Sequence, residues 1–449
     1  MKSYLNLKVL LEGNPESLKP WCYCFIMIIF SIFQFVLQGS LGIFSQGIKE
    51  SFQVDAASVS LLSSSFYYSY IAMQIPAGIF YDRFGIKWVA LTAMFVIALG
   101  CFLLACAPKL IFAICARVII GLGCSFGFVG MLFGIKLWFP GQQFPLISAI
   151  AESASMVGVA LANSLLSHIF LSFGWRVSMY GCSGFAFITA CLIGLAIDEQ
   201  FKNKKESHEN LHPRFPGKSE IIALFKKKEL LIGGGFSACV FSVISVFATL
   251  WAIPFLMTGY QMNVVQATSI CSTIYLGIAV SSPVLGWLVG VFSITAIMSI
   301  GAGLSLFFMI ILLYFSGLSV SLLYFLAFCL GFCCAVYQLS FTLVSQSSPD
   351  HLQGVALGTT NMIAMLAAPI LQPIIGFLIS WSRGGGVLDG FEVYGQQAYQ
   401  QALLILPICL ALAFIGSFLL DDSRVGRLRK HFLHVLFLRL RQSKSWVKH

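Results

Sequence analysis

Charged residues are scarce in this chain, and their scarcity excludes a soluble fold. Asp, Glu, Lys and Arg make up 10% of the 449 residues, whereas hydrophobic residues make up 58%. Between Trp21 and Leu420, runs of about twenty apolar residues alternate with short polar breaks, and a helix of that length crosses the hydrocarbon core of a bilayer. The runs are continuous, as expected of helices, which satisfy their own backbone hydrogen bonds in lipid. We therefore predict an all-α, multi-pass membrane protein.

The residues that several kinds of chemistry require are also missing. The sequence has no Walker-type glycine loop for ATP, and its apolar segments contain no Ser/His pair, His-rich cluster or paired carboxylates. The 14 cysteines lie in apolar segments without metal-ligand spacing. No small-x-small cleavage site follows the first apolar stretch. These absences argue against an enzyme, a metal site, a cofactor and a cleaved signal peptide.

Twelve membrane-spanning helices are expected, six on each side of one long polar break. The first six are expected near residues 20–43, 58–81, 87–107, 110–138, 144–170 and 174–197. The second six are expected near residues 229–257, 267–290, 294–316, 318–345, 354–381 and 398–420. The chain then divides into an N-terminal segment 1–19, a bundle 20–197, a linker 198–228, a second bundle 229–420 and a basic tail 421–449.

The basic residues predict the orientation. All but five of the 27 Lys and Arg residues lie in the N-terminal segment, the 82–87 loop, the end of the fourth span, the linker and the tail. Since basic loops stay in the cytoplasm, we expect both termini there and the protein in the inner (plasma) membrane. The net charge of +10 then reflects topology and not nucleic-acid binding. The tail, with Val425, Leu428, Phe432 and Val435 at helical spacing, either contacts anionic lipid or forms a solvated helix.

Two motifs resemble those of the major facilitator superfamily. The first, GIFYDRFGIKW, runs from Gly78 to Trp88 at the junction of the second and third spans. It matches the superfamily's cytoplasmic loop signature at Gly78, Asp82, Arg83, Gly85 and Lys87, although Ile86 stands where a basic residue is usual. In the fourth span, Arg117-x-x-x-Gly121-x-Gly123 is similar to a second superfamily element.

The resemblance covers the whole chain and implies two pseudo-symmetric six-helix bundles, a monomer, with substrate held between the bundles near the midplane. It also implies that Asp82 latches the cytoplasmic side near Gly354. The second half departs from the pattern, because Gly290 and Val291 replace the Asp-Arg pair and Phe325 replaces the arginine. The fifth span lacks the proline found in many drug/proton antiporters, which argues against drug efflux.

Two charged residues, Arg117 and Glu152, lie well inside spans. An ionisable group at membrane depth costs at least about 2.5–3.5 kcal/mol, so it needs a partner or a watery cavity. We expect the two to lie about 8 Å apart in depth, close enough to interact. One interpretation is a static pair that joins helices. The other is that Glu152 carries a coupling proton, because burial favours a protonated carboxyl group, while Arg117 competes for the carboxylate and binds substrate.

Neutral polar and aromatic residues predict a substrate pocket in a wide central cavity. Gln34 and Gln38 are one turn apart on one face of the first span, where they could also be partners of Arg117. Each such residue alone is better explained by hydrogen bonding between helices, and only the set as a whole predicts a pocket. The set expected to bind substrate is Gln34, Gln38, Tyr67, Arg117, Trp251, Tyr275, Tyr337, Gln338 and Asn361, with Tyr68 and Gln372 as comparable positions.

The eleventh span, GVALGTTNMIAMLAAPILQPIIGFL, resembles a branch of the superfamily related to bacterial phagosomal amino-acid transporters and lysosomal dipeptide carriers. We therefore predict a secondary active, proton-coupled symporter of an amino acid or short peptide. The alternatives are a siderophore or organic-acid transporter, then drug efflux, and, outside transport, a membrane sensor on the same scaffold. The expected partners are the small-molecule substrate, the proton and membrane lipid.

Overall fold

The computed structural model describes residues 15–139, 144–197, 227–348, 353–382, 387–388, 391–392 and 394–420. Most of the predicted N-terminal segment 1–19 and of the linker 198–228, and all of the tail 421–449, lie outside these residues.

Five helices form the first half of the chain. They are α2 (Pro15–Phe52), α3 (Ala56–Phe84), α4 (Ile86–Cys106), α5 (Leu110–Trp138) and α6 (Phe144–Ala196). The 53 residues of α6 contain the predicted fifth and sixth spans, because the helix is broken at Gly174, where φ is 80° and ψ is 170°. Glycine adopts positive φ without a steric penalty, so Gly174 provides the turn between the two spans.

The second half contains more, shorter segments, because four of its predicted spans are divided. The seventh span consists of α8 (Lys228–Ser242), the π-helix η2 (Val243–Trp251) and α9 (Ala252–Tyr260). The eighth and ninth are α10 (Val264–Leu288) and α11 (Ile294–Tyr314). The last three are α12 (Val320–Cys334) with α13 (Tyr337–Ser347), α14 (Gln353–Met365) with α15 (Ala367–Trp381), and α16 (Gln396–Ala402) with α17 (Ile405–Ser417). Between α15 and α16, β1 (Val387–Leu388) pairs antiparallel with β2 (Phe391–Glu392).

The number of spans agrees with the prediction. Ten of the described helices are long and apolar enough to cross a membrane. One of the ten, Leu146–Ala196, contains two spans, and the Ser- and Tyr-rich α3 adds another, which brings the total to twelve. The predicted all-α architecture is therefore confirmed for the described residues, with the short β1–β2 ribbon outside the spans.

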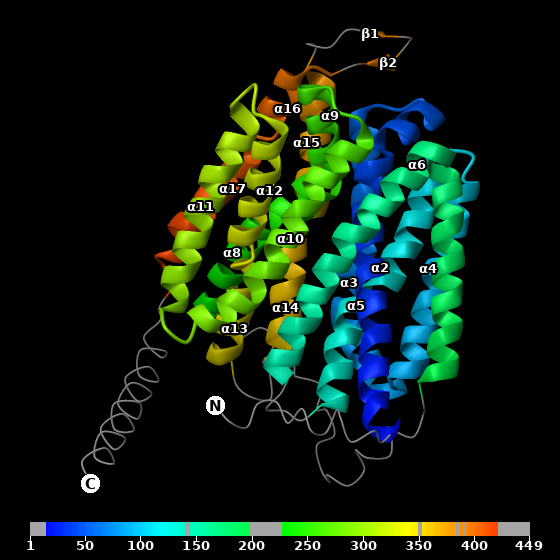
Figure 1. The fold of residues 1–449 in the computed structure, drawn as a ribbon, viewed down its shortest axis with the longest axis vertical. Coiled ribbons are helices and arrows are strands. Elements are labelled where there is room, and N and C mark those ends of the chain that lie inside the picture. Colours follow the sequence, from blue (N-terminus) through cyan, green and yellow to red (C-terminus); the bar gives the residue numbers. More distant parts are fainter. Residues whose placement is uncertain are drawn as a thin grey trace.

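The two halves stand side by side, with α2 to α6 on the right and most of α8 to α17 on the left (Figure 1). We call the end with the α3–α4 turn the inner end, following the predicted orientation, and the end with β1 and β2 the outer end. The start of α2 and the end of α17 both lie toward the inner end. The main contacts between the halves are those of α10 with α6, α15 with α3 and η2 with α2, and α14 on α3 and α9 on α2 add smaller ones.

Close helix packing supports the predicted pseudo-symmetry. On the fourth span, Gly121 lies so close to the backbone carbonyl of Phe66 in α3 that a side chain would not fit. On the tenth span, Gly331 lies equally close to the carbonyl of Ile274 in α10. Because the fourth span packs on the second as the tenth packs on the eighth, the halves repeat one arrangement.

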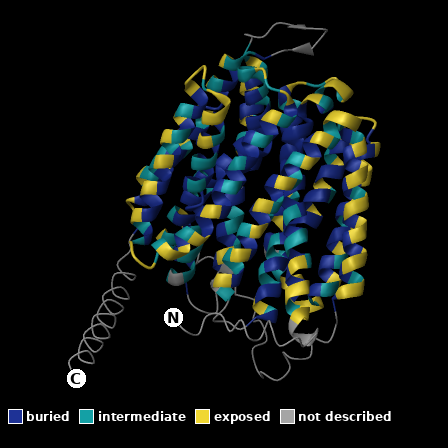
Figure 2. Cartoon of the chain, in the orientation of Figure 1, coloured by how far each residue is buried: buried dark blue, intermediate teal, exposed yellow. Residues whose placement is uncertain are grey.

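The surface is apolar where a soluble protein would be polar. Exposed residues cover the outward faces of the helices (Figure 2), and they include large apolar side chains such as Leu161, Phe173 and Leu195, the last 86% exposed. Monomeric soluble proteins rarely expose apolar patches of this extent. The outward faces are therefore suited to lipid, and the polar residues are left to pack in the interior.

Candidate functional site

A ladder of contacts joins α3 to α14 and α15 across the interface between the halves. From the outer end, Ala57 N donates to Ser380 Oγ at 3.1 Å, and Ser64 Oγ donates to Gln372 Oε1 at 3.4 Å. Tyr68 OH then donates to Pro369 O at 3.3 Å, and Asn361 Nδ2 to Gln74 Oε1 at 2.8 Å. Each step along α3 is matched, to within two residues, by a step back along α15 and α14, so these helices run antiparallel.

The predicted gating motif lies at the inner end of this ladder. Gly85 ends α3 and precedes α4 with φ 79° and ψ 166°, a conformation that is essentially limited to glycine. Arg83 stacks on Phe84 at 5.5 Å and Lys87 on Trp88 at 5.8 Å. Continuing the register of the ladder brings Asp82 to the level of Gly354. The latch between them stays a prediction.

A buried polar network lies at the outer half of the interface. Gln38 Nε2 donates to Tyr67 OH at 3.1 Å, and Tyr67 OH donates to the carbonyl of Ser245 in η2 at 3.1 Å. Gln372 Nε2 donates to the same carbonyl at 2.7 Å, as does Thr249 Oγ1 at 2.7 Å. The Ser245 carbonyl therefore gathers side chains from both halves. The sequence pointed to Gln38, Tyr67 and Gln372, but nothing in it distinguished Ser245 or Thr249.

Arg117 lies in the core of the N-terminal half, against the network. Its Nη1 donates to Leu37 O at 2.9 Å, and its guanidinium lies 5.0 Å from the ring of Phe66. The side chain is 0% exposed, and its Nε and Nη2 have no hydrogen-bond partner among the described residues. Tyr67 lies within electrostatic range of the charge. The expected contact with the side chain of Gln34 or Gln38 is thus wrong in detail, because Arg117 bonds the backbone beside Gln38.

Glu152 is not paired with Arg117, contrary to expectation. The residue is 8% exposed, Oε2 has no hydrogen-bond partner among the described residues, and the carboxylate lies within electrostatic range of Tyr337 of α13. The estimate from depth failed because it ignored which way each helix face turns. Arg117 points to α2 and α3 inside its own half, whereas Glu152 faces the other half.

The remaining predicted residues form separate groups toward the inner end and the outer end. Gln34 Nε2 donates to Tyr70 OH at 3.0 Å, and Gln34 Oε1 accepts from Phe128 N at 2.7 Å. Gln338 Nε2 donates to Ser282 Oγ at 3.2 Å within the C-terminal half. At the outer side Trp251 lies against Tyr399, with ring centroids 6.4 Å apart.

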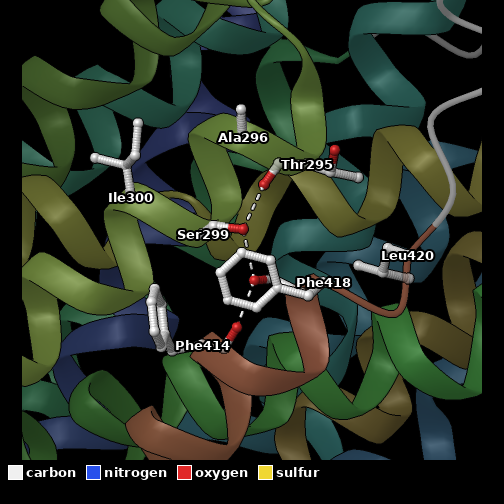
Figure 3. Close-up of a pocket in the computed structure, with 8 residues that line it drawn as sticks. Thr295, Ala296, Ser299, Ile300, Phe414, Phe418 and Leu420 are labelled. Carbon is white, nitrogen blue, oxygen red and sulfur yellow. Dashed lines mark hydrogen bonds between the residues drawn. The ribbon is translucent and has the colours of Figure 1, made fainter.

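The wide central cavity that the sequence predicted is not found at these side chains. Gln34, Gln38 and Tyr67 are 0% exposed, and Trp251 and Tyr275 are 2% exposed. Gln34, Gln38 and Tyr67 form hydrogen bonds with neighbouring side chains or the backbone, and the halves are closed around all five side chains. A pocket of about 470 Å³ lies elsewhere, between α11 and α17 (Figure 3). It is lined by Thr295, Ala296, Ser299, Ile300, Phe414, Ser417, Phe418 and Leu420.

Comparison with known proteins gives a consistent group of matches. The sequence profile of the Major Facilitator Superfamily matches residues 24–371 and 235–435. The "Probable galactarate/D-glucarate transporter GarP" of Escherichia coli is 26% identical over 402 residues, covering 80% of this chain and 88% of GarP. The protein of the same description from Bacillus subtilis, GudP, is 22% identical, covering 82% of this chain and 87% of GudP. A 28% identical match to the "Uncharacterized transporter YybO" of Bacillus subtilis spans 33% of that protein.

Solved structures resemble the fold at low sequence identity. The nucleoside transporter NupG has a TM-score of 0.68 at 16% identity, covering 89% of this chain and 100% of NupG. A bacterial homolog of the human lysosomal transporter Spinster, in an inward-facing and unoccupied conformation, has a TM-score of 0.69 at 16% identity. That match covers 92% of this chain and 98% of the homolog.

Proposed function

The chain belongs to the Major Facilitator Superfamily and is a transporter, not an enzyme, and we propose that it moves a small organic acid across the membrane by alternating access. Organic-acid transport was an alternative to amino-acid or peptide transport in the sequence. We prefer organic-acid transport because GarP and GudP are described as transporters of galactarate and D-glucarate. None of the matches above is described as an amino-acid or peptide transporter.

One observation carries the proposal: Arg117 is fully buried, yet its Nε and Nη2 have no partner among the described residues. Leaving a buried charge uncompensated costs several kcal/mol. A guanidinium binds a carboxylate with two parallel N–H···O bonds, which is the strongest match available to those two free groups. An organic anion is therefore the ligand that Arg117 suits best.

The interface contacts support alternating access. Tyr67 lies beside Arg117 and also bonds the Ser245 carbonyl of the other half. When the halves separate, this bond and the Ser64–Gln372 bond must break. Each buried hydrogen bond contributes about 0.5–1.5 kcal/mol net, so the closed state is favoured by only a few kcal/mol through such contacts. Substrate that binds better to one state can shift an equilibrium of that size.

Glu152 is the group we propose for proton coupling. Its carboxylate lies within electrostatic range of Tyr337 in the other half and has an oxygen without a hydrogen-bond partner among the described residues. Burying this carboxyl group in the closed state costs less free energy when it is protonated and neutral than when it is charged. Protonation would therefore favour closure of the halves around Glu152, and loss of the proton would favour their separation.

Transport by the purified protein in liposomes tests the substrate class. We expect uptake of organic acids, and a loss of at least about tenfold in Arg117→Lys, because a lysine cannot form the bidentate contact. Arg176→Lys is the matched control, because Arg176 also donates to backbone carbonyls, those of Ala105 and Ala107, but at the outer surface. If amino acids or dipeptides are taken up and organic acids are not, the proposal is wrong.

An imposed pH gradient tests the coupling. We expect Glu152→Gln to lose accumulation driven by the gradient but to keep exchange of substrate across the membrane, because the neutral amide mimics the protonated acid. Glu50→Gln, at an exposed carboxylate that bonds Gln46, is the control and should behave as the unmodified protein. Accumulation that persists in Glu152→Gln would return Glu152 to a structural role.

A further inference from the structure

We infer that the transported acid carries one carboxylate and a neutral, hydroxyl-rich remainder, and that it binds with the carboxylate toward the N-terminal half. This inference rests on the proposed function, because it specifies which organic acids the carrier selects. It comes from the unequal charge of the two halves at their interface.

Beyond Lys228 and Glu229 at the start of α8, the spans of the C-terminal half contain no charged residue. Residues 230–349 contain no Asp, Glu, Lys or Arg, and neither do α14, α15, α16 and α17. In the N-terminal half, Arg117 is the one fully buried cation among the described residues. Arg117 lies within electrostatic range of Tyr67, which bonds the other half, so a ligand that replaces this bond between the halves meets one buried positive charge, on one side only.

A second carboxylate on the ligand would meet no further buried cation among the described residues. It would face the neutral C-terminal half, where burial of an unpaired charge is strongly unfavourable. If it turned toward the inner end instead, it would approach the Glu152 carboxylate, and like charges at one site disfavour each other. Either orientation selects against a dianion.

The C-terminal half is suited to hydroxyl groups. The Ser245 carbonyl accepts from Tyr67 and the Gln372 amide oxygen accepts from Ser64, both across the interface, and Ser245 and Gln372 are buried. In addition, Ser245 Oγ and Trp251 Nε1 are buried without a hydrogen-bond partner among the described residues. A hydroxyl both donates and accepts, so a polyhydroxylated chain can bond with the carbonyl, the amide, the serine and the indole alike.

Compounds with one carbon skeleton and different charges test the inference. Galactonate, galactarate and galactitol share the six-carbon chain and the configuration of its hydroxyls, and they carry one, two and no carboxylates. The monomethyl ester of galactarate keeps the six-carbon chain of galactarate, is larger by one methyl group and carries a single charge. Uptake of each would be measured in liposomes that contain the full-length protein, with empty liposomes as the blank and with gluconate and glucarate as a second pair.

We expect galactonate and the monoester, or gluconate in the second pair, to be taken up faster than the dianions and galactitol by a factor on the order of ten or more. Equal or faster uptake of galactarate or glucarate would overturn the inference and leave the proposed function intact. A monoester as slow as galactarate would also overturn it, because size and not charge would then decide. Uptake of nucleosides or amino acids without any of these acids would instead refute the proposed function itself.

Discussion

Replacing Gly42 by alanine would test whether the approach of α2 to η2 holds the outer side closed. A Cβ at position 42 would lie 2.6 Å from the carbonyl oxygen of Thr249 and 3.3 Å from the Cα of Leu250, both in the other half. Ordinary contact begins at 3.4 Å, so the two backbones would have to separate by about 0.8 Å. Backbone on both sides cannot rotate away as a flexible side chain can.

The substitution should destabilise the closed arrangement of the two halves and not the folded state as a whole. Overpacking of this kind costs about 1–3 kcal/mol, and the clash exists only when the two halves meet. Within α2 itself, alanine is favoured over glycine by roughly 0.5–1 kcal/mol. The ratio of closed to open molecules should therefore fall by about 5- to 150-fold, while the unfolding temperature stays near that of the unmodified protein.

Hydrogen–deuterium exchange of the peptides that cover η2 would measure the shift, with the protein in nanodiscs. Gly184→Ala in α6 is the matched control, since a Cβ there meets no atom within 4 Å. We expect faster exchange in η2 for Gly42→Ala and no change for the control. If η2 exchanges at the same rate in both variants, the contact between Gly42 and Thr249 does not hold the halves together.

Two further substitutions probe the turn and the network. Gly85→Ala should lower stability by about 1–3 kcal/mol, because its backbone conformation is nearly restricted to glycine; thermal unfolding would show this against Gly78→Ala, whose added Cβ meets nothing within 4 Å. Tyr67→Phe removes the hydroxyl that joins Gln38 to Ser245 and should weaken closure by about 1–3 kcal/mol, seen as faster exchange in η2. Tyr81→Phe is the control, because it loses a bond to Phe126 O within one half. It should lower the unfolding temperature without faster exchange in η2. If η2 exchanges at the same rate in Tyr67→Phe and Tyr81→Phe, the Tyr67 hydroxyl does not hold the halves together.

The architecture could be predicted because each span is a local property of the chain. A run of apolar residues has the same consequence in a bilayer wherever it occurs, so the twelve spans follow from composition in short windows. Gly85 could be placed for the same reason, since a tight turn needs glycine at a given point in the chain. Divisions such as the π-helix η2 had no such signal, because their apolar composition fits a continuous helix equally well.

For the site, the sequence could predict which residues take part but not which partners they contact. Gln38, Tyr67 and Gln372 were identified because polar residues are unfavourable in spans without partners, and the structure places all three in one network. Which partners they find was not predictable. Ser64 and Gln372 are 308 residues apart in the chain, and the sequence between them does not fix how the two helices rotate and slide against each other.

By itself, then, the sequence determined the solvent of this protein, its span number and the side of the membrane on which its basic residues are expected, since these depend on charge and hydropathy along the chain. Only the tertiary structure decided that Arg117 turns into its own half while Glu152 faces the other. It alone decided that the predicted cavity residues close on one another. The physical reason is that a helix places a side chain on a face, but the packing of neighbouring helices decides what that face meets.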